Sequence, residues 1–352
     1  MIKLNSIIDH NFTINNDFVV KIENDLISDT SCVRKNDKWR TKYGSFNFKS
    51  NLNFEIGEIL IIYPKKKFIE RFFRPSANSN TILLTENCDQ KCLMCSQPPK
   101  NKDYLNFDMY EKACDLVPKE TVIGISGGEP TLFKRDLFFM LRKILEKRPD
   151  INFHILSNGQ HFEKSDISDL IAINSNILWG IPIYSSSEVI HDFIVGKKNA
   201  FSVLNDNLEL LRSSGSRLEI RTVVMKNNIN DLENIAINIY KNHNWLEVWA
   251  IMQLEKYGFA KINWENIFFD TSQSFEAIQK ALIATKLYDI NTKLYNFPYC
   301  TVPEFFKEMT VKSISDWKQK FIDECTGCNK KNNCCGFFEW YDGSYKNIRA
   351  LN

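Results

Sequence analysis

The sequence carries little net charge and contains no long apolar run. Its 45 Lys and Arg residues nearly balance 43 Asp and Glu residues, and a formal net charge of +2 does not favour a nucleic acid as partner. No stretch approaches the roughly 18 apolar residues that a membrane span needs, so we expect no membrane association. Residues 1–5 become polar too early for a signal peptide, and we therefore expect a cytoplasmic protein.

Several catalytic motifs are also missing. The chain has no P-loop and no grouping of Ser, His and Asp that indicates nucleophilic catalysis. The short basic run Lys65–Lys67 is more typical of a solvated loop than of a binding patch. The composition, 43% hydrophobic and 25% charged, is that of an ordinary globular protein.

Cysteine is the residue type that stands out. All but two of the ten cysteines fall in two groups, near residues 88–95 and 300–335. In a reducing compartment, clustered cysteines indicate metal or redox chemistry rather than disulfides. Of the remaining two, Cys114 has the helical spacing of a buried core thiol and Cys32 shows no partner.

From about Thr81 onward, short β-like runs alternate with amphipathic helical patterns. The strands are expected at Thr81–Thr85, Thr121–Ser126, Ile151–Leu156, Ile177–Tyr184, Leu218–Met225 and Leu246–Gln253. Six strand–helix units predict a parallel α/β fold, either an open barrel or a doubly wound sheet. The active site of such folds lies at the carboxyl ends of the strands.

The composition divides the chain into three predicted domains. Residues 1–80 contain short β-like runs, such as Phe18–Ile22 and Glu58–Tyr63, and form a small β-rich N-terminal module. Residues 81–285 form the (β/α) core, and residues 286–352 are an irregular Cys-rich segment. We expect that last segment to be stabilised by something other than a large apolar core.

The first cysteine group directly follows the strand at Thr81–Thr85 and has the spacing C-x3-C-x2-C, formed by Cys88, Cys92 and Cys95. Three thiolates on one loop can ligate three irons of a cubane cluster and leave the fourth iron open to a small chelating molecule. Zinc is the alternative, but a structural zinc site usually takes four protein ligands, and no His lies nearby.

Two glycine-containing motifs end the next strands. Gly127, Gly128 and Glu129 stand in a Ser-Gly-Gly-Glu-Pro turn, where backbone carbonyls can accept hydrogen bonds from an ammonium group and Glu129 adds negative charge. Ser157 and Asn158 precede Gly159 at the end of the third strand, which by itself is equally typical of a turn. Both motifs are expected at the same edge of the sheet as the cysteine triad.

The second cysteine group offers five thiols for a site that takes four. Cys325, Cys328 and Cys334 form a compact C-x2-C-x5-C unit, and Cys300 can supply a fourth ligand from a distance. We favour an auxiliary iron–sulfur cluster here, although four-cysteine zinc sites use the same knuckles.

With these motifs in place, residues 81–255 resemble the radical SAM superfamily. The resemblance implies a partial (β/α)6 TIM-like radical SAM barrel. It implies that Cys88, Cys92 and Cys95 bind a 4Fe–4S cluster, whose open iron binds S-adenosylmethionine (SAM). The cofactor-binding residues that it implies are Gly127, Gly128, Glu129, Ser157 and Asn158, together with Met94, which stands where an adenine-contacting aromatic residue is common.

The motifs of the C-terminal half narrow the resemblance. The chain is similar to the radical SAM maturases of the His-Xaa-Ser repeat peptide system, and to the C-type maturase in particular. The segments that carry this similarity are Cys95–Pro99, Gly180–Tyr184, His191–Asp192, Asn296–Cys300, Ser315–Lys318 and Cys335–Phe338. In that family the residue after the third tail cysteine varies, which favours Cys334 over Cys335 as the ligand.

The resemblance implies an enzyme that cleaves SAM reductively to a 5′-deoxyadenosyl radical and modifies a ribosomally made peptide. Its implied partners are SAM, a precursor peptide, an electron donor such as flavodoxin or ferredoxin, and a partner maturase. Two alternatives stay open: a radical SAM enzyme that acts on a small molecule, and a zinc-stabilised binding protein without catalytic activity. No residue is singled out as a proton donor or acceptor.

Overall fold

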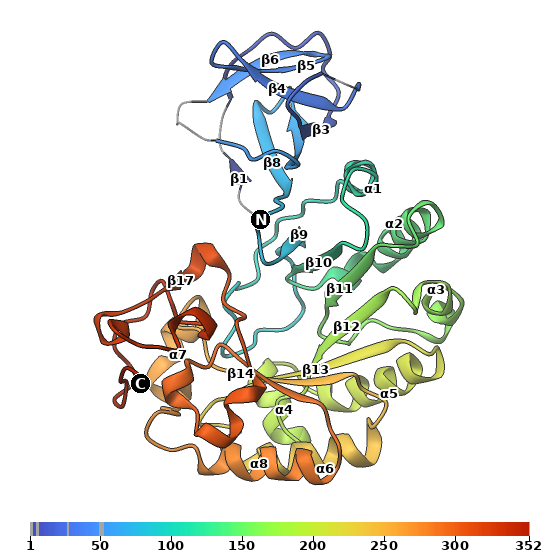
Figure 1. The fold of residues 1–352 in the computed structure, drawn as a ribbon. Helices are drawn as coiled ribbons and strands as arrows, with labels where there is room; N and C mark the ends of the chain where they lie inside the picture. Colours follow the sequence, from blue (N-terminus) through green and yellow to red (C-terminus); the bar gives the residue numbers. More distant parts are fainter. Residues whose placement is uncertain (1–2, 5–6, 27, 49–52, 352) are drawn as a thin grey trace. The chain divides into compact units, whose positions relative to one another are not determined.

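The computed structural model describes residues 3–4, 7–26, 28–48 and 53–351 (Figure 1). The chain divides into two compact units. The first comprises residues up to Leu84, Tyr104–Ser126 and Phe133–His154, and the second comprises Thr85–Asp103, Gly127–Leu132 and the residues from Ile155 onward. No helix among the described residues is long and apolar enough to cross a membrane.

An eight-stranded sheet forms the N-terminal part of the first unit, with the strand order β1-β8-β7-β3-β4-β5-β6-β2. Its strands are β1 (Lys3–Leu4), β2 (Ile7–His10), β3 (Phe18–Ile22), β4 (Ser31–Lys35), β5 (Lys38–Thr41), β6 (Gly44–Phe48), β7 (Ile59–Tyr63) and β8 (Phe68–Phe73). All pairs are antiparallel except β3 with β4. The predicted β-rich module is therefore confirmed.

The core of this sheet includes Val20, Leu60, Trp39 and Cys32. Cys32 lies in a stretch that looks polar in the sequence, yet its side chain is fully buried on β4. Burial in these apolar surroundings raises the pKa of its thiol far above the usual range. Cys32 is a structural thiol.

The first unit also holds the greater part of three further strands and the first two helices. These elements are β9 (Asn80–Thr85), β10 (Val122–Gly127), β11 (Asn152–Leu156), α1 (Phe107–Cys114) and α2 (Lys134–Lys147). Helix α2 is amphipathic, and Leu137, Leu141 and Ile144 on its inner face are fully buried. Cys114 is likewise buried at the end of α1, as expected of a core thiol.

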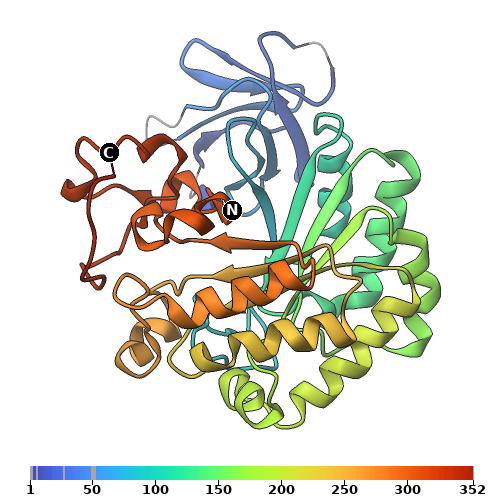
Figure 2. The same ribbon diagram turned by 60° about the horizontal axis from the view of Figure 1, so that its bottom comes forward.

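Parallel strands form the sheet of the second unit. The strands β12 (Ile177–Pro182), β13 (Arg217–Val223), β14 (Val248–Met252), β15 (Thr292–Tyr295) and β16 (Thr310–Val311) pair in chain order. The helices are α3 (Ile167–Ile173), α4 (Glu188–Val195), α5 (Ala200–Ser213), α6 (Leu232–Asn242), α7 (Phe259–Ile267) and α8 (Glu276–Leu287). Figure 2 shows the helices coloured yellow to orange side by side along these strands.

The sheet extends further along the chain than the sequence indicated. Strands β15 and β16 follow residue 285, where we expected only irregular structure. The sequence does not reveal them because each is short and half-buried. The rest of the tail consists of 3-10 turns and a small antiparallel pair, β17 (Gln319–Lys320) with β18 (Phe337–Phe338). Gly215 follows the end of α5 with a φ of 68°, the left-handed conformation that is typical of a helix-terminating glycine.

Candidate active site

The loop that carries the cysteine triad rests on the end of α4. Within the second unit, the Lys91 N–H donates to the Val195 carbonyl over 3.0 Å, and the Leu93 N–H donates to the Ile194 carbonyl over 2.9 Å. These carbonyls lie in the last turn of α4, which lacks partners for them inside the helix. The loop is thus fixed by backbone hydrogen bonds.

Burial of the three thiols disfavours their charged forms. It raises the pKa of Cys88 to about 11, with further increases from the charges of Glu129, Asp89 and Cys95. Burial also raises the pKa of Cys92, to which the charges of Cys95 and Cys88 contribute, and that of Cys95. Three close, partly buried thiols are a donor set that a cationic iron–sulfur cluster would stabilise as thiolates.

The described residues include no group of three or more His, Cys, Asp or Glu side chains arranged around one metal-ion position. A cubane cluster differs from a single ion in that its ligands bind separate irons. The assignment of metal to either cysteine group stays a prediction.

Gly128 joins the glycine motif to the start of the triad loop. Its N–H donates to the Thr85 carbonyl over 2.8 Å, and the Glu129 N–H donates to the Asn87 carbonyl over 2.7 Å. A Cβ atom on Gly128 would lie 2.0 Å from the Asn87 carbonyl oxygen. Only glycine allows this approach, which fixes the motif against the residue that precedes Cys88.

The carboxylate of Glu129 lies inside the protein. It is fully buried and accepts hydrogen bonds from the Thr131 N–H (2.9 Å), the Ser157 hydroxyl (2.8 Å), the Thr131 hydroxyl and the Asn158 N–H. Burial raises its pKa, while these hydrogen bonds lower it. The sequence suggested only a negative charge near the cofactor, whereas the structure shows that Glu129 joins the two motif loops.

Asn158 reaches the triad itself. Its Nδ2 donates to the Asp89 carboxylate over 2.7 Å and lies 3.9 Å from the Cys88 sulfur. Asp89 also pairs with His161, at 3.3 Å, and with Lys197. Although burial opposes the charged form, these partners hold the pKa of Asp89 well below its usual range.

Sequence reasoning missed Asp89, His161 and Lys197. The only signal was the place of Asp89 between two cysteines, since His161 and Lys197 belong to no motif. Their pairing depends on loops that come together only in the fold.

Met94 and Tyr184 lie on the apolar side of the triad loop. Met94 is 7% exposed and belongs to an apolar cluster with Leu254 and Trp264, against which Cys92 and Tyr184 also pack. Burial, then the charges of the triad, raises the pKa of the Tyr184 hydroxyl well above its usual range. Contact of Met94 with an adenine ring stays a prediction.

His191 and Asp192 lie within α4. The Asp192 carboxylate accepts a hydrogen bond from the Phe201 N–H over 2.9 Å, in the first turn of α5. Burial lowers the pKa of His191 to about 4, and its Nδ1 accepts from the Tyr184 N–H. Both residues therefore act in helix packing and capping.

The second cysteine group is brought together from distant parts of the tail. Burial raises the pKa of Cys300 to about 11, with smaller contributions from the charges of Cys334 and Cys325. The Cys328 sulfur accepts a hydrogen bond from the Leu351 N–H over 3.4 Å. Burial raises the pKa of Cys325, and the charges of Cys334 and Cys328 raise it further. Each of the four thiols that the sequence singled out therefore interacts electrostatically with at least one of the others.

Cys334 and Cys335 have different environments. The Cys334 sulfur accepts hydrogen bonds from the N–H groups of Tyr299 (3.4 Å) and Gly336 (3.3 Å). A hydrogen bond from Cys335, then those N–H groups, lowers the pKa of Cys334 to about 6. Burial raises the pKa of Cys335 well above its usual value, and its S–H donates to the Gly336 carbonyl. Of the two thiols, Cys334 has the lower pKa, and its assignment as a cluster ligand stays a prediction.

Residues 82–237 match the model of the radical SAM superfamily. This segment is a radical SAM domain. A GTP 3′,8-cyclase from Synechocystis sp. is 23% identical to the chain over 224 residues, which make up 58% of this chain and 65% of the cyclase.

Two crystal structures of SuiB from Streptococcus suis share the fold. The complex with the precursor peptide SuiA has a TM-score of 0.51 at 17% identity, and the complex with SAM has a TM-score of 0.50 at 16% identity. They cover 61% of this chain but only 48% and 49% of SuiB. The chain thus spans less than two thirds of these relatives. The predicted fold class, a partial radical SAM barrel, is confirmed.

Proposed function

We propose that the protein is a radical SAM enzyme that modifies a ribosomally made peptide. The observation that carries this proposal is the hydrogen-bonded frame around the triad loop. Gly128 and Glu129 bond to the backbone at Thr85 and Asn87, and the Glu129 carboxylate bonds to Ser157 and Asn158. These hydrogen bonds therefore join three motifs that are far apart in the sequence: the triad loop, the glycine motif at Gly127–Glu129 and the motif at Ser157–Asn158.

In this proposal Cys88, Cys92 and Cys95 hold a 4Fe–4S cluster. The backbone at Gly127 and Gly128 binds the methionyl amino group of SAM, while Ser157 and Asn158 lie near the ribose. When bound, the reduced cluster supplies the electron that cleaves SAM and gives a 5′-deoxyadenosyl radical. The residues of the chain position SAM and exclude water from it.

A second cluster on Cys300, Cys325, Cys328 and Cys334 is part of the proposal. The grouping of these thiols and the two N–H donors to the Cys334 sulfur favour it, since hydrogen bonds to ligand sulfurs tune such clusters. The division into an N-terminal module (1–80), a radical SAM core (81–285) and a Cys-rich segment (286–352) belongs to the same proposal.

The peptide substrate is favoured by the fold neighbour SuiB, which was crystallised with a precursor peptide. The resemblance to the His-Xaa-Ser maturases, described above from the sequence motifs, favours it too. A small-molecule substrate is the second candidate, because the relative from Synechocystis is a GTP cyclase. The proposal includes two further partners. These are an electron donor such as flavodoxin or ferredoxin, and a partner maturase.

Incubation of the anaerobically purified and reconstituted protein with SAM and dithionite tests the proposal. We expect 5′-deoxyadenosine, measured by liquid chromatography, and a mass change in a short peptide encoded next to the gene. A Cys335→Ser variant is the matched control for variants that lose a thiol of the triad. A colourless protein with zinc and neither iron nor sulfide would end the radical proposal. Formation of 5′-deoxyadenosine with GTP converted and the peptide unchanged would favour the second candidate.

A further inference from the structure

An open cleft of about 520 Å³ lies in the second unit, at α7 and the end of the tail. Three parts of the chain line it. These are Lys226 and Lys256, which follow β13 and β14, then residues between 264 and 274, and residues 342–346 of the tail. Ligand pockets usually measure roughly 300–1,000 Å³, so the cleft has room for a short segment of peptide.

Helix α7 connects the cleft to the triad loop. The Phe259 N–H donates to the Cys95 carbonyl over 2.8 Å, and the Asn263 Nδ2 donates to the Leu93 carbonyl over 2.9 Å. The next residue of the helix, Trp264, lines the cleft. A ligand in the cleft is therefore held next to the helix that supports the triad loop.

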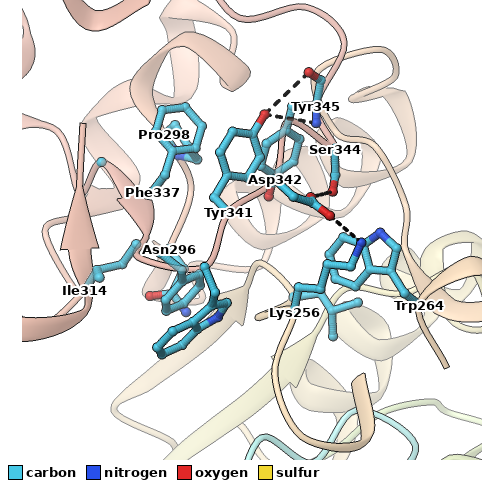
Figure 3. A pocket seen from close by; sticks show the side chains of 14 residues that line it. Lys256, Trp264, Asn296, Pro298, Ile314, Phe337, Tyr341, Asp342, Ser344 and Tyr345 are labelled. Carbon is cyan, nitrogen blue, oxygen red and sulfur yellow. Dashed lines mark hydrogen bonds and ion pairs between the residues drawn. The ribbon is translucent and has the colours of Figure 1, made fainter. Parts of the chain in front are cut away.

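Stacked aromatic rings contribute to the lining. The ring centroids of Trp264 and Phe268 are 4.2 Å apart, and their planes are inclined by only 15°. The Lys256 ammonium lies 4.7 Å from the Trp264 ring centroid. Figure 3 shows Lys256 and Trp264 beside a neighbouring cavity of about 20 Å³, which shares these residues and has room for one water molecule. Rings of this kind bind aromatic and apolar side chains by packing.

Two of the three carboxylates in the lining already have donors from the chain. Asp342 forms an ion pair with Lys256 at 2.6 Å, visible in Figure 3. Asp270 accepts hydrogen bonds from the N–H (2.9 Å) and the hydroxyl of Ser272. The third carboxylate belongs to Glu265, which is exposed and forms no ion pair within the described part of the chain.

Two ammonium groups have no counter-ion among the residues that the structure describes. Lys226 is exposed, and its Nζ donates to the Glu265 carbonyl oxygen over 2.7 Å, which leaves its charge uncompensated. Lys346 is exposed and forms no ion pair there either. A lysine carries three donors on a flexible stem, so both side chains can bind an anionic group in the cleft. Two such ammonium groups against one such carboxylate favour a ligand with a single negative charge.

From these observations we infer that the cleft binds a segment of the peptide substrate in which an acidic residue neighbours an aromatic one. Trp264 and Phe268 pack against the ring, and Lys226 and Lys346 bind the carboxylate. This inference rests on the proposed function, because it names a recognition site for the same substrate. A nucleoside triphosphate matches the lining less well, since it carries several negative charges that Glu265 would repel.

Saturation-transfer NMR on the reconstituted full-length protein tests the inference with three probes. These are acetyl-Ala-Phe-Glu-Ala-amide (the Glu peptide), acetyl-Ala-Phe-Gln-Ala-amide (the neutral Gln peptide) and acetyl-Ala-Ala-Glu-Ala-amide, which lacks the ring. We expect the Glu peptide to bind about fivefold more tightly than either of the others, as exposed ion pairs and ring packing allow. Added salt should reduce the preference for the Glu peptide over the Gln peptide, because salt screens exposed charges.

Lys226→Gln combined with Lys346→Gln should weaken binding of the Glu peptide to the level of the Gln peptide, without changing binding of the Gln peptide. Lys261→Gln is the matched control, because Lys261 is exposed on α7 but lies outside the lining; binding should not change. Ser274→Trp narrows the cleft and should weaken binding of both peptides. The thermal unfolding midpoint checks the folding of each variant.

Equal binding of the Glu and Gln peptides to the wild type would overturn the inference, as would unchanged binding of the Glu peptide in the double lysine variant. Tighter binding of GTP than of the Glu peptide, lost in the same variant, would assign the cleft to a nucleotide and also reject the inference. Formation of 5′-deoxyadenosine in the same preparations reports on the proposed function separately. SAM cleavage without a preference for the Glu peptide would therefore reject the cleft and leave the radical chemistry in place.

Discussion

The two cysteine groups are built in different ways. The triad follows a strand, its loop is bonded to α4, and the neighbouring motif loops are bonded to it through Gly128, Glu129 and Asn158. The second group lies in a tail of 3-10 turns. Within that tail, no residue from 315 to 333 is buried, although Cys325 and Cys328 stand there.

This difference indicates how each site depends on metal. The frame of the triad is formed by backbone and side-chain hydrogen bonds that need no metal. The stretch 315–333 buries little apolar surface to offset the entropy of ordering it, so we expect ligand bonds to contribute much of its order. We therefore expect the first site to be preorganised and the second to be ordered by the metal that it binds.

Loss of a triad thiol should have the largest effect. Cys92→Ala removes one of three cluster ligands and should reduce 5′-deoxyadenosine formation to the level without enzyme. Cys328→Ala should retain SAM cleavage, because the frame of the first site does not involve the tail. Both are measured by chromatography under dithionite. Equal loss in the two variants would show that the sites are not separable.

Within the second group, Cys334 and Cys335 should differ. Cys334→Ser should lose the iron of the tail site, since this sulfur accepts two N–H hydrogen bonds and favours the thiolate. Cys335→Ser should keep that iron, because the Cys335 thiol is buried and donates to a carbonyl. Iron and sulfide analysis per chain provides the measurement. Loss of iron in Cys335→Ser and retention of iron in Cys334→Ser would identify Cys335, and not Cys334, as the ligand.

Removal of metal should loosen the tail more than the triad loop. After anaerobic treatment with a chelator, we expect faster proteolysis within 315–333 and unchanged cleavage within 86–103. Mass spectrometry of the fragments locates the sites. If both segments became sensitive at the same rate, the triad loop would depend on its metal as strongly as the tail does.

Gly128→Ala should weaken the frame of the first site. The added Cβ would meet the Asn87 carbonyl oxygen at 2.0 Å, and relief of such overpacking costs about 1–3 kcal/mol of unfolding free energy. Gly343→Ala is the control for glycine loss in the tail. Nothing lies within 4 Å of its Cβ position, and only its φ of 88° is unfavourable. Urea denaturation compares the two, and a smaller effect at Gly128 would contradict the frame.

Asn158→Ala should have the smallest effect, on the redox potential. Its amide lies 3.9 Å from the Cys88 sulfur, and loss of a hydrogen bond to a ligand sulfur lowers the potential of a cluster. Redox titration followed by spectroscopy should show a lower midpoint potential for the first cluster and no change for the second. An unchanged potential would mean that the Asn158 amide acts only on Asp89 and has no effect on the Cys88 sulfur.

Much of the fold could be predicted from sequence periodicity. Strand β3 coincides with the predicted Phe18–Ile22, and β9 to β14 lie within one or two residues of their predicted bounds. Short, nearly continuous apolar runs made these strands visible. The short strands β15 and β16 were missed because half-buried segments of two to four residues leave no periodic signal.

Only those residues of the site that belong to sequence motifs could be predicted. The cysteines and glycines have spacings that a sequence shows, but the role of Glu129 depends on where its side chain points. Asp89, His161 and Lys197 form their network through loops that are distant along the chain.

The central claim is that Cys88, Cys92 and Cys95 hold a cluster that binds SAM. Electron paramagnetic resonance of the dithionite-reduced, anaerobically purified protein, recorded before and after addition of SAM, tests it most directly. We predict a reduced-cluster signal that SAM alters in the wild type and in Cys328→Ala, and that is missing in Cys92→Ala. A wild-type signal that SAM leaves unchanged, or a SAM-responsive signal that persists in Cys92→Ala, would contradict the claim.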